Sequence, residues 1–233
     1  MQLDIKKALY SPFSRKDWLP TLIVLSLLTF STITSYYTKY NAVFMFFFMV
    51  ICFGYSCQFS HNEINNIKPV LPSWKLDFAK YLKYGFFCSL GMALYTLILG
   101  IIVIPLGVLA NIAESKIFDY SYIFVSNLVL IFIGFVQCLY SENFKFKDML
   151  PLSKPFKLIL NVKLELLMCF IVHIITGTIV SYWGNYNGQI YIKNTFFLFT
   201  RALGSLILVN LLAQTYKIAK ERAVFYSVCH ENK

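Results

Sequence analysis

The chain has 233 residues, of which 58% are hydrophobic and only 14% are charged. An ordinary soluble domain has about 45–50% apolar and about 25% charged residues, so this composition excludes a water-soluble globular protein. The net charge of +10 does not indicate nucleic-acid binding, because the lysines are spread over several short segments without a recognisable binding module. Attraction to the anionic headgroups of a lipid bilayer is the simpler explanation.

Long uncharged stretches separate these lysine-bearing segments. A membrane-spanning helix needs about 20 mostly apolar residues, and six stretches meet this requirement. Runs such as 44–50 and 97–103 are apolar at every position, which excludes the alternating pattern of a transmembrane β-strand. We therefore predict an all-α fold, a polytopic transmembrane bundle in a single membrane domain, with spans at about 18–37, 41–60, 84–110, 121–140, 164–183 and 195–216.

The Lys and Arg residues gather on one side of this predicted bundle. If the six spans alternate in direction, 17 of the 21 cationic residues lie on the side of the two chain ends. The other side has Lys39, Lys116, Lys193 and Arg201. Because short, positively charged loops stay in the cytoplasm, we predict a multi-pass protein of the bacterial inner membrane with both chain ends inside.

Each longer cytoplasmic connection contains a proline beside aromatic or apolar residues and lysines. These segments, around Pro12, Pro72 and Pro151, precede the first, third and fifth spans, which suggests a threefold repeat of an interfacial segment and a helical hairpin. In 144–159, Phe, Met, Leu and Ile alternate with lysines. This segment is either a helix lying in the headgroup plane or an ordinary loop with amphipathic ends.

The acidic residues give no indication of catalysis or ion coupling. Every Asp and Glu lies in a loop, in a tail or at the end of a span, so we expect no carboxylate-based proton or sodium relay. The six cysteines lack C-x-x-C or zinc spacing, and phosphate-loop, zinc-helix and nucleophile-elbow motifs are absent from the sequence. We predict no catalytic residues, no cofactor and no metal site.

Three polar positions inside the predicted spans are the candidates for a functional role: His173, Arg201 and Asn127. His173 either takes part in a proton path or metal site, or is a neutral side chain hydrogen-bonded to a neighbouring helix. Arg201 lies near the outer interface, where it either pairs with Glu114 or Asp119 or contacts an anionic ligand or lipid headgroup. Four amides are expected to form hydrogen bonds between helices: Asn127, Gln137, Asn210 and Gln214.

Short motifs give the chain a resemblance to a known family. They are Tyr10-Ser11-Pro12-Phe13 followed by Trp18, Leu71-Pro72-Ser73-Trp74 with Asp77-Phe78, and Ala213-Gln214-x-Tyr216. With these motifs the chain resembles a group of bacterial and archaeal integral membrane proteins known only as a domain of unknown function. The resemblance implies a six-span architecture over nearly the whole chain, and it implies no activity.

Two functional hypotheses follow. The first is a non-enzymatic membrane protein that interacts with lipid, in particular anionic lipid at its Lys-rich segments, or with partner membrane proteins. The second is a small-solute transporter or permease subunit whose path passes His173, Asn127 and Arg201. An intramembrane enzyme is the least supported reading, because no acid, base and nucleophile converge in the sequence.

Overall fold

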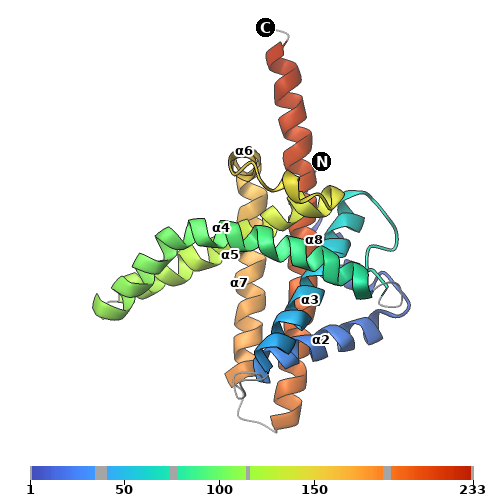
Figure 1. Ribbon diagram of the computed structural model, residues 1–233, viewed down its shortest axis with the longest axis vertical. Coiled ribbons are helices and arrows are strands. Elements are labelled where there is room, and N and C mark those ends of the chain that lie inside the picture. Colours follow the sequence, from blue (N-terminus) through green and yellow to red (C-terminus); the bar gives the residue numbers. More distant parts are fainter. Residues whose placement is uncertain (1, 35–40, 74–77, 114–115, 186–189, 232–233) are drawn as a thin grey trace.

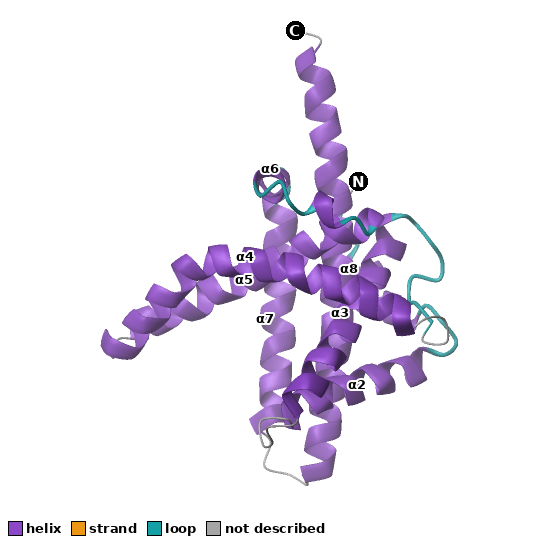
Figure 2. Ribbon diagram, viewed as in Figure 1, coloured by secondary structure: helices purple, strands orange, loops and turns teal. Residues whose placement is uncertain are grey.

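The computed structural model describes residues 2–34, 41–73, 78–113, 116–185 and 190–231, and every regular element within these ranges is a helix (Figures 1 and 2). The longer helices are α2 (Trp18–Thr34), α3 (Asn41–Ile64), α4 (Phe78–Ala113), α5 (Lys116–Asn143), α7 (Lys163–Asn185) and α8 (Ile190–Glu231). The shorter ones are α1 (Ile5–Tyr10), η1 (Ser11–Phe13), η3 (Phe146–Asp148) and α6 (Ser153–Leu160). The predicted all-α fold is confirmed.

Within the described residues, four helices are long and apolar enough to cross a membrane. They are Phe78–Ile112, Lys116–Asn143, Lys163–Tyr182 and Phe196–Phe225. They contain the third and fourth predicted spans and all but one residue of the fifth and of the sixth. The predicted spans at 18–37 and 41–60 coincide with α2 and α3, although residues 35–40 lie outside the described ranges. The number of six spans, their orientation and the threefold repeat remain predictions.

Two helices extend well beyond the predicted spans. α4 begins at Phe78 rather than at 84, so that Lys80 and Lys83 lie within the helix. α8 continues past 216 to Glu231 and reaches 42 residues. Apolarity defines where a chain can cross lipid, but Lys, Arg, Glu and Ala are good helix formers in water as well. The helix therefore does not end where the apolar stretch ends.

α8 is the centre of the arrangement. It contacts α1, α2, α3, α5, α6 and α7, whereas α4 packs against α3, α5 and η3. In Figure 1 the hairpin of α4 and α5 runs across α7 and α8 and reaches far to one side, while the last turns of α8 stand clear of the other helices. Two clusters of buried residues include α8, and a third joins α3, α4 and α5 without it. The core therefore has a second centre where the hairpin of α4 and α5 meets α3.

α3 and α4 touch through their backbones. A Cβ atom added to Gly54 would lie 1.8 Å from the carbonyl oxygen of Tyr81, and one added to Gly85 would lie 1.7 Å from that of Val50. Small residues allow two membrane helices to approach this closely. The two glycines therefore set the spacing of this helix pair.

Hydrogen bonds from buried tyrosines hold the connecting segments against the helices. Tyr55 donates a hydrogen bond to the carbonyl of Pro72 (2.9 Å), and Tyr95 donates one to the carbonyl of Met149 (2.6 Å). A buried tyrosine hydroxyl needs such a partner. Pro72, before α4, and Met149, before α7, are consequently held against the bundle.

The segment before α7 forms a short amphipathic helix. In α6, Pro155 and Leu158 are buried, whereas Phe156 and Leu160 are exposed. The helix packs on α5, α7 and α8. A helix in this segment agrees with the interfacial alternative, and its position in the headgroup plane remains a prediction. The described part of the corresponding segment before α4, residues 67–73, is not helical.

Candidate functional site

The structure brings two of the three predicted site residues together. His173 on α7 and Asn127 on α5 lie side by side, with Nε2 of the ring 3.0 Å from Oδ1 of the amide. Because Asn127 donates its own Nδ2 to the carbonyl of Ile123 (2.7 Å), its oxygen accepts and the ring nitrogen donates. The pair is a hydrogen bond between two helices, as the structural alternative for His173 expects.

Arg201 does not join this pair. Its side chain is exposed on α8, and among the described residues it has no hydrogen bond or ion pair with His173, Asn127 or Asp119. Glu114, the other predicted partner, lies outside the described residues. The three candidates therefore do not form one site.

The predicted amide contacts are confirmed for Asn210 and Gln214, which lie one turn apart on α8. Gln214 donates to Oδ1 of Asn210 (2.8 Å), and both amides bond to residues of other elements. Gln137 is different, because its Nε2 is buried and has no hydrogen-bond partner. The prediction of an interhelical contact for the Gln137 donor is not met.

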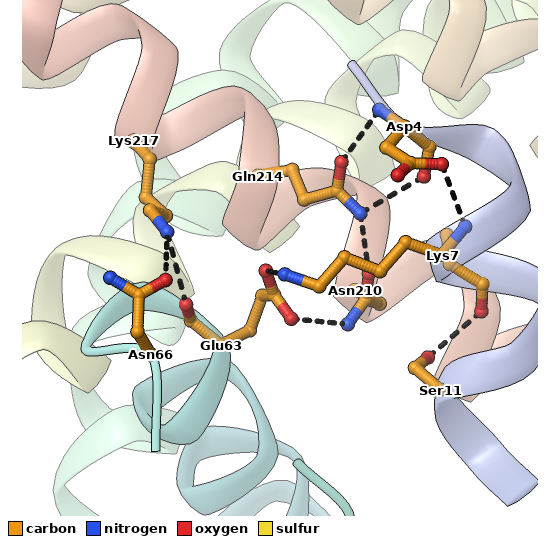
Figure 3. A network of polar contacts seen from close by, with 9 residues as sticks. Asp4, Lys7, Ser11, Glu63, Asn66, Asn210, Gln214 and Lys217 are labelled. Carbon is orange, nitrogen blue, oxygen red and sulfur yellow. Dashed lines mark hydrogen bonds and ion pairs between the residues drawn. The ribbon is translucent and has the colours of Figure 1, made fainter. Parts of the chain in front are cut away.

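A larger polar site surrounds these α8 amides, and we call it the α8 polar cluster; Figure 3 shows its part around Glu63. It consists of residues on α8 and their partners near the ends of other helices. The members on α8 are Asn210, Gln214, Tyr216, Lys217, Lys220 and Arg222, and the partners are Asp4, Lys7, Glu63, Glu142 and Glu165.

Glu63 is the most buried acid of the cluster. It lies in the last turn of α3, and its side chain is 0% exposed. Oε1 forms an ion pair with Lys7, and Oε2 accepts a hydrogen bond from Asn210 (3.2 Å). Figure 3 shows Lys7 and Asn210 approaching the carboxylate, and Lys217 reaching the backbone carbonyl of Glu63 and the side chain of Asn66. Each carboxylate oxygen thus has a donor, as a buried charge requires.

The same part of α8 holds the N-terminal segment. Gln214 accepts from the backbone N–H of Asp4 (2.8 Å) and donates to the carbonyl of Asp4 (3.1 Å). The Asp4 side chain caps α1 by accepting from the backbone N–H of Lys7 (2.8 Å). One amide therefore fixes the start of α1, and α1 in turn directs Lys7 toward Glu63.

Two further acids attach α5 and α7 to α8. Glu142, at the end of α5, pairs with Lys220 and accepts from the hydroxyl of Tyr216 (2.8 Å). Glu165, in the first turn of α7, binds both terminal nitrogens of Arg222, with Nη2–Oε1 at 2.5 Å and Nη1–Oε2 at 3.2 Å. This two-point geometry is a strong and directional form of ion pair.

The α8 polar cluster consists of ion pairs and hydrogen bonds between helices. Each of its three glutamates is paired with a cation. Within the described residues, no three His, Cys, Asp or Glu side chains lie close enough to hold a metal ion. The contacts of the cluster attach α8 to the ends of α3, α5 and α7.

Sequence reasoning placed these acids correctly at helix ends and missed their convergence on α8. The signal that could have found it is spacing. Asn210, Gln214 and Lys217 are separated by four and then three residues, so they share one face of a continuous helix. The predicted sixth span ends at 216, which places Lys217 in a tail. The face that Lys217 shares with Asn210 and Gln214 was therefore not recognised.

The comparisons with known proteins add no relative. No family model, no curated protein and no solved structure matches the chain.

Proposed function

We propose that this chain is a six-span protein of the bacterial inner membrane that acts by binding, without catalysis, and that its Lys-rich cytoplasmic face contacts anionic lipid. The observation that supports this proposal is which charged side chains at that face form ion pairs. The acids at the ends of α3, α5 and α7 are all paired within the α8 polar cluster. The lysines beside them are left without acidic partners.

These unpaired lysines come from several elements. Among the ion pairs between described residues, none includes an exposed lysine of α4, η3, α6, α7 or the connections before them. They are Lys68, Lys80, Lys83, Lys145, Lys147, Lys157 and Lys163. A lysine close to an anionic membrane surface contributes about 1 kcal/mol to attraction, so a face with this many is suited to anionic headgroups.

The proposal is tested by the lipid that the protein retains. The full chain is purified from bacterial membranes in mild detergent, and the ratio of anionic to zwitterionic phospholipid bound to it is measured by mass spectrometry. We expect enrichment of anionic lipid relative to the source membrane. Replacing Lys145, Lys147 and Lys157 by Gln should lower the enrichment about fivefold or more.

Lys116→Gln is the matched control, because this exposed lysine lies at the opposite end of α5. It should leave the enrichment unchanged. Equal lipid ratios in the wild type and the source membrane would overturn the lipid proposal. A protein that copurifies in fixed proportion with the wild type, and is lost from the triple variant, would identify a partner membrane protein as the ligand instead.

The permease alternative rests on the pair of His173 and Asn127. A solute path past this pair predicts flux in proteoliposomes that His173→Ala abolishes. Arg201→Ala should then leave flux intact, because Arg201 makes no contact with the pair. Unchanged flux in His173→Ala would remove this alternative.

A further inference from the structure

A pocket lies between the end of α3 and the beginning of α4. Its volume is about 210 Å³ and it is partly open to the exterior. Ligand pockets for drug-sized molecules have about 300–1,000 Å³, so this one suits a smaller group. Four parts of the chain line it: the segment before α2, the last turns of α3, the connection 67–73 and the first turn of α4.

Three cationic side chains line the pocket, and they come from three separate parts of the chain. They are Arg15, Lys68 and Lys80. The described residues that line the pocket include no Asp or Glu. Such a gathering of positive charge is unfavourable unless an anion or solvent balances it. The lining therefore favours a ligand with negative charge.

The pairing of Arg15 leaves it able to bind a ligand. Asp17 accepts from Nε (2.6 Å) and from Nη2 (3.0 Å) of its guanidinium group. A guanidinium carries five N–H donors, so the pair with Asp17 orients Arg15 and leaves other donors open. Lys80 lies with its Nζ 5.6 Å from the centre of the Tyr84 ring, and neither Lys68 nor Lys80 has an ion pair with a described residue.

We propose that this pocket binds the phosphate of an anionic phospholipid. The phosphate contacts Arg15, Lys68 and Lys80. The inference rests on the proposed function for the cytoplasmic position of these helix ends, and it deepens that function by naming one defined site. Elsewhere on the same face, lipid is held by charge alone.

The connection 67–73 forms one wall of the pocket and is held in place by hydrogen bonds to other elements. Tyr55 and Tyr81 donate to the carbonyls of Pro72 and Ser73, at 2.9 and 2.7 Å. Leu71 is buried, and its backbone N–H donates to Oγ of Ser14 (3.1 Å). The wall is therefore built before any ligand arrives, which limits the ordering cost of binding.

The test measures binding to the full chain in nanodiscs of zwitterionic phosphatidylcholine. The probes are short-chain phosphatidylglycerol, short-chain phosphatidic acid, glycerol 1-phosphate and inorganic phosphate. We expect the two lipids to bind more tightly than the two free phosphates. Lys68→Gln and Lys80→Gln should each weaken the binding of phosphatidylglycerol about fivefold, and the double variant about thirtyfold.

The matched control is Lys145→Gln with Lys147→Gln, two exposed lysines of the same face that do not line the pocket. Because these lysines take part in the general attraction to anionic lipid, the control should weaken binding about fivefold at most, against about thirtyfold for the pocket double variant. The unfolding temperature of each variant reports that it is folded.

The outcomes are distinct. Equal loss of binding in the pocket variant and the control overturns the site and leaves general attraction to the face. Glycerol 1-phosphate binding as tightly as the lipid overturns the lipid source and identifies a free phosphate ester. If the triple variant of the proposed function retains its lipid enrichment while the pocket double variant loses phosphatidylglycerol, the pocket stands and the proposal of a lipid-binding face fails.

Discussion

The two longest helices, α4 and α8, differ in how much of their apolar part is buried inside the protein. In α8, 50% of the most apolar window is buried inside the bundle, whereas in α4 the share is 11%. Yet α4 is 36 residues long and α8 is 42. At about 1.5 Å per residue both exceed the roughly 30 Å of hydrocarbon in a bilayer. Length and apolarity alone therefore do not tell which helix carries the fold.

The difference lies in where polar side chains are placed. α8 presents amides, a tyrosine and three cations to four other elements, whereas α4 presents mainly Leu and Ile outward, including Leu97, Ile101 and Ile104. Polar contacts made in a low-dielectric setting need defined partners. Apolar contacts with lipid do not. We expect substitutions on α8 and its partners to lower the free energy of unfolding strongly, and substitutions on the outer half of α4 to lower it weakly.

The largest effect is expected at the ion pair of Glu63. Lys7→Met leaves the fully buried carboxylate of Glu63 without its ion-pair partner. Because Lys7 itself is 41% exposed, the cost lies below the about 3–5 kcal/mol of a fully buried pair, at about 2–3 kcal/mol. The free energy of unfolding, measured by SDS titration in mixed micelles, should fall by about that amount. Lys6→Met is the matched control at the exposed neighbouring position, and a similar loss in both variants would contradict the assignment.

The next effect compares two glycines of α4, Gly85 and Gly100. Gly85→Ala places a methyl group against the backbone of α3 and should destabilise the protein by about 1–3 kcal/mol. Gly100→Ala, on the outer half of the same helix, meets Ile104 at an ordinary 3.6 Å and should be neutral or stabilising, since Ala is the better helix former. The same SDS titration measures both, and equal effects would refute the close contact.

A smaller effect is expected where α7 meets α8. Arg222→Lys keeps the charge but loses the two-point contact with Glu165 and the bond to the carbonyl of Asn161. Because Arg222 is partly exposed, we expect a loss of about 1 kcal/mol. Thermal unfolding in detergent should show a lower midpoint. Lys163→Arg serves as the control, and an unchanged midpoint for Arg222→Lys would show that charge alone suffices.

The smallest effect concerns the pair of His173 and Asn127. Hydrogen bonds between membrane helices contribute about 0.6 kcal/mol on average in double-mutant cycles. We expect a coupling of this size between His173→Phe and Asn127→Leu. Additive single effects would show that the two side chains are neighbours without a bond, and a much larger coupling would point to a network beyond the pair.

The parts of the fold that could be predicted from sequence are those set by solvent. Lipid requires long apolar helices, and the charge-free stretches marked α4, α5, α7 and α8 to within a few turns. The parts that could not be predicted depend on which elements meet. Glu63 looked like an ordinary helix-end acid, and its full burial follows from the position of α8. Of the candidate residues, His173 and Asn127 meet, and Arg201 does not join them.

The continuity of α8 has a mechanical consequence. About half of its length of roughly 63 Å is more than a bilayer requires, and Figure 1 shows the last turns standing free. The exposed side chains of Val224 and Phe225 lie toward the C-terminal end of α8. A force that tilts this end of α8 would therefore act on α3, α5 and α7 together, because their glutamates are paired with or hydrogen-bonded to α8.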